Sequence, residues 1–272
     1  MEYSGKLLTY DKDRLPAIEG VARDMERRCL EKGVLGPYLA GLWKNNLHLG
    51  LLWHARYDIM SGEVQSRRPA KYRAPSWSWA SVEGGVDFIA ETVYADGNLV
   101  AEAHVVEAGC MAAGEGTFGP FSSGKLWLSG KAIRSDLLYR PRPAGQGMFR
   151  PEEVDVYGFV LQRPNDGDRP IWVRPDVADL ASVSLSEEEV DVKEESEWRN
   201  LGSVYAISLA TMSLHDGDIR TYSVMLKAKE HGVEGGERIV YERVGFGFEN
   251  YPSDKPRASW FFDAERRVDE IH

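Results

Sequence analysis

Aromatic side chains are the residues of this sequence whose types and spacing are best suited to chemistry. The chain has 8 Trp and 12 Tyr, and these rings combine a large apolar body with one polar hydrogen. A pocket lined by such rings holds an apolar ligand and orients one or two of its oxygens. For any single tryptophan, a place in the core is the favoured alternative. The candidate substrate-binding residues are Trp53, Tyr72, Trp77, Trp79, Tyr205, Tyr222, Tyr241 and Phe246.

The segment APSWSWASVEG (Ala74–Gly84) places two tryptophans two residues apart. Residues two apart in an extended strand point the same way, so we expect Trp77 and Trp79 to share one face. We expect one ring to anchor the N-terminal helices to the β-rich part of the chain and the other ring to reach a cavity.

Arg73 and His54 are the candidate catalytic residues. Either side chain could donate a hydrogen bond to a carbonyl oxygen of the substrate, since a histidine donates in both of its protonation states. The favoured alternative for Arg73 is a surface charge before a proline-containing turn. The favoured alternative for His54 is a histidine at a helix end that caps backbone carbonyls.

Motifs for other chemistries are absent from the sequence. It contains no P-loop, no Rossmann fingerprint and no H-E-x-x-H, and no G-x-S-x-G nucleophile elbow. The six histidines are scattered, and the cluster LHDGD (Leu214–Asp218) is better explained as a turn than as a cation site. The sequence therefore predicts no metal site and no cofactor.

Composition limits the partners and the setting. The formal net charge of −10 argues against a nucleic-acid partner, because neutralising phosphates needs a basic surface. Cys29 and Cys110 suggest neither a disulfide framework nor a zinc site. The N-terminus lacks the apolar run of a signal peptide, and no apolar stretch reaches the roughly 18 residues that span a bilayer. We expect a soluble, cytoplasmic protein without a membrane span; the sequence gives no oligomeric state.

Two helices are expected in the first 60 residues, where they would help to position the candidate substrate-binding residues. Apolar residues recur every three or four positions from Leu15 to Cys29, which predicts one helix with Pro16 in its first turn. A second helix is expected from Pro37 to about Trp53, where leucines and tryptophans form a broad apolar stripe.

After Tyr57 short β-rich runs alternate with clusters of Gly, Pro, Asp and Asn. The expected fold class is α+β and mainly β: an antiparallel β-barrel or sandwich with two or three N-terminal helices packed against it. We expect a single domain over residues 1–272, with a helical part at 1–60 and a β-rich part at 61–272. Flexible stretches are expected near 112–124 and 185–198.

Several segments resemble a known family. The runs YSGKLLTYDKDRLPAIEGVA (Tyr3–Ala22), YLAGLWKNNLHLGLLW (Tyr38–Trp53) and RAPSWSWASVEGGV (Arg73–Val86) follow one another in this order. They are similar to the region after the HET domain in fungal heterokaryon-incompatibility (HET) proteins. Later runs such as YERVGFGF and ASWFFDAERRVDEI resemble the family's β-rich tail more weakly. The resemblance implies a stand-alone HET-like protein without the HET domain, so that domain's signalling activity is not carried over.

The resemblance also implies a function. Stand-alone HET-like proteins occur beside fungal secondary-metabolite pathways, and some resemble cofactor-free cyclases of the Diels–Alder type. A cyclase of this kind would bind an apolar terpenoid or polyketide in an aromatic pocket. A pericyclic reaction needs a folded substrate and a hydrogen bond to an activating carbonyl rather than a nucleophile. The alternative is a non-catalytic regulatory or protein-interaction module derived from a HET protein, since a sequence without catalytic motifs suits either function.

Overall fold

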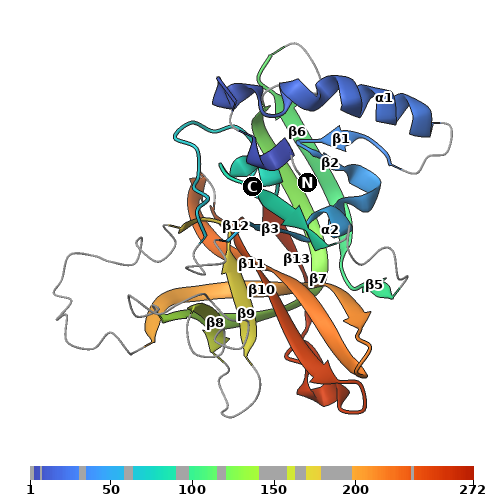
Figure 1. Cartoon of the computed structure of the whole chain (residues 1–272). Helices are drawn as coiled ribbons and strands as arrows, with labels where there is room; N and C mark the ends of the chain where they lie inside the picture. Colours follow the sequence, from blue (N-terminus) through green and yellow to red (C-terminus); the bar gives the residue numbers. More distant parts are fainter. Residues whose placement is uncertain are drawn as a thin grey trace, which may run out of the picture.

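The computed structural model describes residues 3–6, 8–30, 35–57, 64–89, 98–114, 121–140, 158–162, 170–178, 198–233 and 236–272. In Figure 1 a group of short N-terminal elements lies over one end of a large twisted sheet. Of the two stretches expected to be flexible, the one near 185–198 lies outside the described residues except for its last residue. The other, near 112–124, is described only at its two ends.

The first predicted helix is confirmed. A short 3₁₀ turn at Pro16–Ile18 leads into helix α1 (Glu19–Leu30), with the proline in the first turn as expected. Only part of the predicted apolar face is buried, because Ala22 is covered whereas Val21 and Met25 are exposed. Figure 1 shows α1 at the outer edge of the molecule, with the other labelled elements on one side of it.

The second predicted helix is wrong. Strands β1 (Tyr38–Leu39) and β2 (Leu42–Trp43) form a small hairpin in its place. A 3₁₀ turn (Lys44–Asn46) and the short helix α2 (Leu47–Gly50) follow the hairpin, before strand β3 (Trp53–Ala55), which pairs with β4 (Val86–Phe88). The N-terminal part is therefore less helical than the apolar stripe predicts.

The turn of the hairpin explains why a helix does not form there. Gly41 has φ +94°, a left-handed conformation that favours glycine. A Cβ at this position would clash with the indole nitrogen of Trp79. That indole N–H instead donates to the Gly41 carbonyl at 3.0 Å. A tryptophan distant in sequence thus stabilises the hairpin over a helix.

The tryptophan-rich segment is not the expected strand. Its first residues form a turn, and Trp79–Ser81 form a 3₁₀ turn that the Ser78 hydroxyl caps by accepting from the Ala80 amide. The same hydroxyl donates to the carbonyl of Ala40 in the β1–β2 hairpin. The segment therefore connects the short N-terminal elements to one another.

The large sheet contains nine strands within the described residues. They are β5 (Leu99–Ala101), β6 (His104–Ala112), β7 (Phe121–Arg140), β8 (Gly158–Gln162), β9 (Ile171–Pro175), β10 (Arg199–Ser213), β11 (Asp218–Val233), β12 (Gly236–Pro252) and β13 (Arg266–Ile271). The strand order is β13–β7–β8–β9–β12–β11–β10–β5, and β6 pairs with β7.

The long strands change partners along their length, and the sheet is bent as a result. Strand β7 pairs with β6 and β13 over its first half and with β8 and β10 over its second half. Strand β13 pairs in parallel with β12, so the sheet is mixed. The coarse prediction of a mainly β fold with short N-terminal helices is confirmed. The expected antiparallel barrel or sandwich is corrected to one bent, mixed sheet.

Arg243 on β12 occupies the contact between the sheet and the N-terminal part, and its side chain is fully buried. Its guanidinium donates to the Asp176 carboxylate at 3.0 Å, to the Leu51 carbonyl at 2.7 Å and to the Trp53 carbonyl. It also lies 3.6 Å from the ring centroid of Trp53. One buried cation therefore joins β12, the end of β9 and the start of β3.

We expect Arg243→Met to lower the free energy of unfolding by about 3 kcal/mol or more, because Asp176 would keep a buried charge without its main partner. Urea unfolding monitored by tryptophan fluorescence measures the loss. Arg134→Met, which removes an exposed arginine of β7, is the matched control and should change stability little. A loss below about 1 kcal/mol for Arg243→Met would contradict the role given to this ion pair.

Candidate functional site

His54 lies where β3 contacts the large sheet. Strand β3 contacts β9 and β12, and the buried ring of His54 is 5.9 Å from that of Phe246 on β12. In the sheet, Phe246 pairs with Arg174 of β9 and with Val224 of β11. Paired residues of neighbouring strands share a face, so Arg174 and Phe246 are on the face of the sheet that His54 contacts.

The same face continues over the next rows of the sheet. Phe248 pairs with Trp172 of β9 and with Tyr222 of β11, and Asn250 pairs with Arg220. Residues two apart along a strand also share a face, so these side chains extend the face that His54 contacts. We call this surface the arginine–aromatic face; its residues are His54, Tyr57, Trp172, Arg174, Arg220, Tyr222, Phe246, Phe248 and Asn250.

His54 is neutral at pH 7. Burial, followed by the nearby Arg174 guanidinium, lowers the pKa of His54 to about 4. Its Nδ1 is 3.1 Å from the Ala55 carbonyl, to which it donates as N–H, so Nε2 accepts from Arg174 at 3.0 Å. The imidazole thus holds Arg174 in place, and both of its nitrogens are engaged within the protein.

Arg174 is half-buried among aromatic rings. Its guanidinium carbon is 4.8 Å from the ring centroid of Tyr57 and 6.0 Å from that of Phe248. Burial lowers the pKa of Arg174, and the positive charge of Arg220 lowers it as well. The two guanidiniums therefore affect each other electrostatically.

Arg220 approaches the same phenylalanine from β11. Its guanidinium carbon is 5.1 Å from the ring centroid of Phe248, and its Nε donates to the Asn250 side-chain oxygen at 2.7 Å. Burial raises the pKa of the Tyr222 phenol, while the neighbouring Arg220 and Arg174 act in the opposite direction. Tyr222 is therefore a neutral hydroxyl at physiological pH.

This arrangement combines two hydrogen-bonding cations with apolar surface. The side chains of Trp172, Arg174, Arg220 and Phe248 are each only partly buried. A guanidinium offers several N–H donors in a planar fork that matches a carbonyl or carboxylate oxygen. The rings supply the contact for the apolar part of a ligand.

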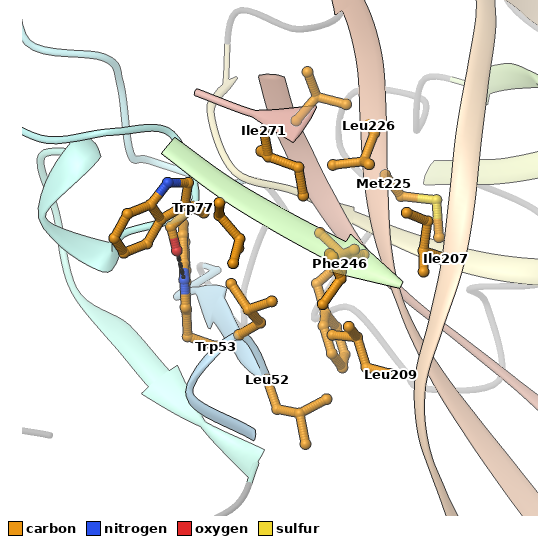
Figure 2. Packing of buried hydrophobic residues seen from close by; sticks show 14 of the residues in the cluster. Leu52, Trp53, Trp77, Ile207, Leu209, Met225, Leu226, Phe246 and Ile271 are labelled. Carbon is orange, nitrogen blue, oxygen red and sulfur yellow. Dashed lines mark hydrogen bonds between the residues drawn. The ribbon is translucent and has the colours of Figure 1, made fainter. Parts of the chain in front are cut away.

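The three tryptophans predicted to bind substrate are instead part of the core, where Trp53, Trp77 and Trp79 are fully buried. Trp53 donates its indole N–H to the Trp77 carbonyl at 3.0 Å, as the dashed line in Figure 2 shows. Trp79 contacts the ring of Tyr3 edge-on, so it is the ring that anchors the N-terminal elements. The indole N–H of Trp77 has no hydrogen-bond partner among the described residues.

Arg73 and Tyr72 lie apart from the arginine–aromatic face in their contacts. Arg73 is buried and donates to the carbonyls of Ala80 and Val82 at 2.7 and 2.9 Å. Arg73 therefore stabilises the tryptophan-rich segment. Both predictions for this residue, a surface charge and a donor to the substrate, are wrong. Tyr72 is 54% exposed.

Tyr205 and Tyr241 form a second group. Their ring centroids are 5.4 Å apart, and Arg267 lies over both rings and donates to the Tyr241 hydroxyl at 3.0 Å. Arg267 also forms an ion pair with Asp269. Of the candidates named from sequence, the structure therefore brings together His54, Tyr222 and Phe246 on one face and separates Tyr205 and Tyr241 from them.

Arg174, Arg220, Phe248 and Asn250 were missed by the sequence reasoning. A signal was present, because WVR, RTY and FGFEN each place aromatic and polar residues two apart, hence on one face of a strand. What the sequence does not contain is the pairing of β9, β12 and β11, which brings the three patterns side by side.

Comparison with family models, with curated proteins and with solved structures finds no significant match to this chain. The resemblance to HET proteins therefore stays a prediction. Within the described ranges, no three or more His, Cys, Asp or Glu side chains are placed to hold a metal ion. In that same part of the chain, no helix is both long enough and apolar enough to cross a membrane.

The depressed pKa of His54 predicts how stability depends on pH. Between the ordinary pKa of 6.5 and about 4, the unfolded chain binds a proton at this residue that the folded chain does not. The stabilisation is therefore complete above pH 6.5 and is lost as the pH falls towards 4. We expect the unfolding free energy of the natural protein to fall between pH 7 and about 4.5 by roughly 2 kcal/mol more than that of His54→Gln.

Urea unfolding of both proteins at the two pH values tests this expectation. Glutamine stays neutral and can still accept from Arg174, so the comparison isolates the imidazole from the carboxylates that titrate in the same range. Equal losses of stability in the two proteins would show that His54 is not held neutral.

Proposed function

We propose that this protein is a cofactor-independent cyclase that catalyses a pericyclic, Diels–Alder-type reaction on an apolar terpenoid or polyketide. The observation that carries the proposal is the arginine–aromatic face, where Arg174 and Arg220 stand beside Phe248. Rings bind an apolar substrate, and N–H donors polarise the carbonyl that activates a dienophile. A role in fungal natural-product biosynthesis in the cytoplasm belongs to the same proposal and rests on the resemblance to stand-alone HET-like proteins.

The reaction requires the protein to fold the substrate and to polarise one oxygen. In a [4+2] cycloaddition, three π bonds of the diene and dienophile become two σ bonds and one π bond, and no proton or electron is transferred. Holding the reacting carbons at about 3.5 Å or less lowers the entropic part of the barrier. A guanidinium N–H directed at the carbonyl oxygen stabilises the negative charge that grows there in the transition state.

The roles of the residues follow from their contacts. Arg174 is the candidate donor to the substrate, and neutral His54 is a positioning residue that orients it. Phe246 and Tyr222 stack with 5.8 Å between their centroids and form the floor of the face. Trp53, whose ring lies against Arg243, supports β3 from the core.

A second candidate function is a non-catalytic protein-interaction module. The exposed side chains of Val21 and Met25 favour it, because they lie four residues apart and hence on one side of α1. Exposed apolar residues that cluster on one surface mark protein-binding sites. This function would leave the arginine–aromatic face without catalytic effect.

We expect the purified protein to accelerate the cyclisation of linear polyenes that carry a carbonyl-activated dienophile, and to fix the stereochemistry of the product. Arg174→Met should lower the rate enhancement by about 100-fold, because it removes a charged donor to the transition-state oxygen. Chiral chromatography of the product against time measures both the rate and the stereochemistry.

Arg134→Met, on the exposed surface of β7, is the control and should cyclise at the natural rate. Equal rates and equal product ratios with protein and with buffer alone, across such polyenes, would reject the cyclase and favour the interaction module. An unchanged rate in Arg174→Met would reject Arg174 as the donor.

A further inference from the structure

We infer that Arg174 and Arg220 together bind the carboxylate, or another acidic oxygen group, of an otherwise apolar ligand. The inference rests on the proposed function in taking this ligand to be the substrate. It adds the chemical class of that substrate, which is an aromatic or polyene acid rather than a neutral hydrocarbon.

The partners of the arginines carry the inference. Three buried or partly buried arginines elsewhere in the described structure have carboxylate or carbonyl acceptors. Arg243 pairs with Asp176, Arg267 pairs with Asp269, and Arg73 donates to two backbone carbonyls. Arg174 and Arg220 instead contact a neutral imidazole, a side-chain amide, a phenol and aromatic rings. Neither forms an ion pair within the described residues.

The electrostatics of the face favour an anion. Burial lowers the pKa of Arg174, because a desolvated charge is unfavourable until it is paired. The positive charge of Arg220 lowers this pKa further, so each of the two cations destabilises the other. A ligand carboxylate would neutralise the repulsion and replace the lost hydration.

Two acidic side chains close to the arginines, Asp87 and Glu249, are already engaged. Asp87 acts on Arg174 through its charge, but its carboxylate accepts from Arg56 at 2.9 Å. Glu249 lies between Phe248 and Asn250 in sequence and so points to the opposite face of β12. It is buried there and accepts from Ser259 and from the Trp260 amide.

The free donors are suited to a carboxylate. Arg174 uses one terminal nitrogen on His54, and Arg220 uses Nε on Asn250 and a further donor on the Tyr222 hydroxyl, whereas a guanidinium has five N–H donors. Charge-assisted, bidentate hydrogen bonds to a carboxylate are the strongest contacts that these donors make. Phe248 and Trp172, in the row between the two arginines, would contact the apolar body of the ligand.

The overall charge of the chain further limits the class of ligand that this face would bind. A net charge of −10 repels polyanions such as nucleic acids at a distance. A singly charged ligand with a large apolar part is repelled less strongly than a polyanion, and its contact with the aromatic rings adds to its affinity. The face therefore selects a monoanionic apolar acid.

The test compares 2-naphthoate with 2-naphthamide, which has the same rings without the charge. We expect naphthoate to bind the natural protein at least about ten-fold more tightly at low salt, measured by calorimetry. Arg174→Met and Arg220→Met should each weaken naphthoate binding by about ten-fold and leave naphthamide binding nearly unchanged. Arg220→Lys should retain part of the preference, and the control Arg134→Met should retain all of it.

Stability provides a second readout that a simple folding defect would not imitate. Removing one of two repelling cations should leave the urea midpoint of Arg220→Met equal to or above that of the natural protein. Naphthoate, and not naphthamide, should raise the unfolding temperature of the natural protein.

Three results would overturn the inference: equal affinity for the two probes, full preference in the methionine variants, or no naphthoate binding at millimolar concentration. These results are distinct from failure of the cyclase. Selective naphthoate binding without any cyclisation would reject the cyclase and keep the acid site. Cyclisation of neutral polyenes by the natural protein, without any preference for naphthoate over naphthamide, would keep the cyclase and reject the acid site.

Discussion

The buried pairing of Arg243 with Asp176 is the constraint on which the rest of the structure depends. A cation with no exposed surface is tolerated only where acceptors surround it, and here they come from Asp176 and from the carbonyls of Leu51 and Trp53. This requirement fixes β3 against β9 and β12. Because Arg174 lies two residues before Asp176 on β9, and His54 follows Trp53 on β3, the same pairing brings His54 and Arg174 together.

The arginines of this protein therefore divide into two groups with different consequences. Arg243 and Arg73 are saturated by acceptors within the chain, so their donors are consumed in holding segments together. Arg174 and Arg220 are held by neutral contacts to His54, Asn250 and Tyr222, and each keeps N–H donors that these contacts do not use. The residue type is the same in both groups, and the acceptors that the fold places around each guanidinium decide which arginine is structural. That is why Arg73, chosen from its neighbours in sequence, proved to be a structural residue.

The local features of the fold were predictable from the sequence and the non-local ones were not. The helix after Pro16 and the strands after Tyr57 follow from periodicity within each segment. The hairpin at Gly41 does not, because it depends on an indole from a segment nearly forty residues away. Similarly, Tyr222 and Phe246 were recognised by residue type, but Arg174 and Arg220 gain meaning only from the register that aligns them with Phe248.

The neutrality of His54 links this register to the chemistry of the face. A protonated imidazole would add a third positive charge beside Arg174 and would lose the lone pair on Nε2 that accepts the arginine's hydrogen bond. Burial between β3 and the large sheet and the positive charge of Arg174 both act against that proton, and they lower the pKa of His54 to about 4. The imidazole can therefore orient the guanidinium without competing for the anion that the guanidinium would bind. A carboxylate in its place would orient the arginine equally well, but it would also neutralise the charge that distinguishes this face from the acidic remainder of the molecule.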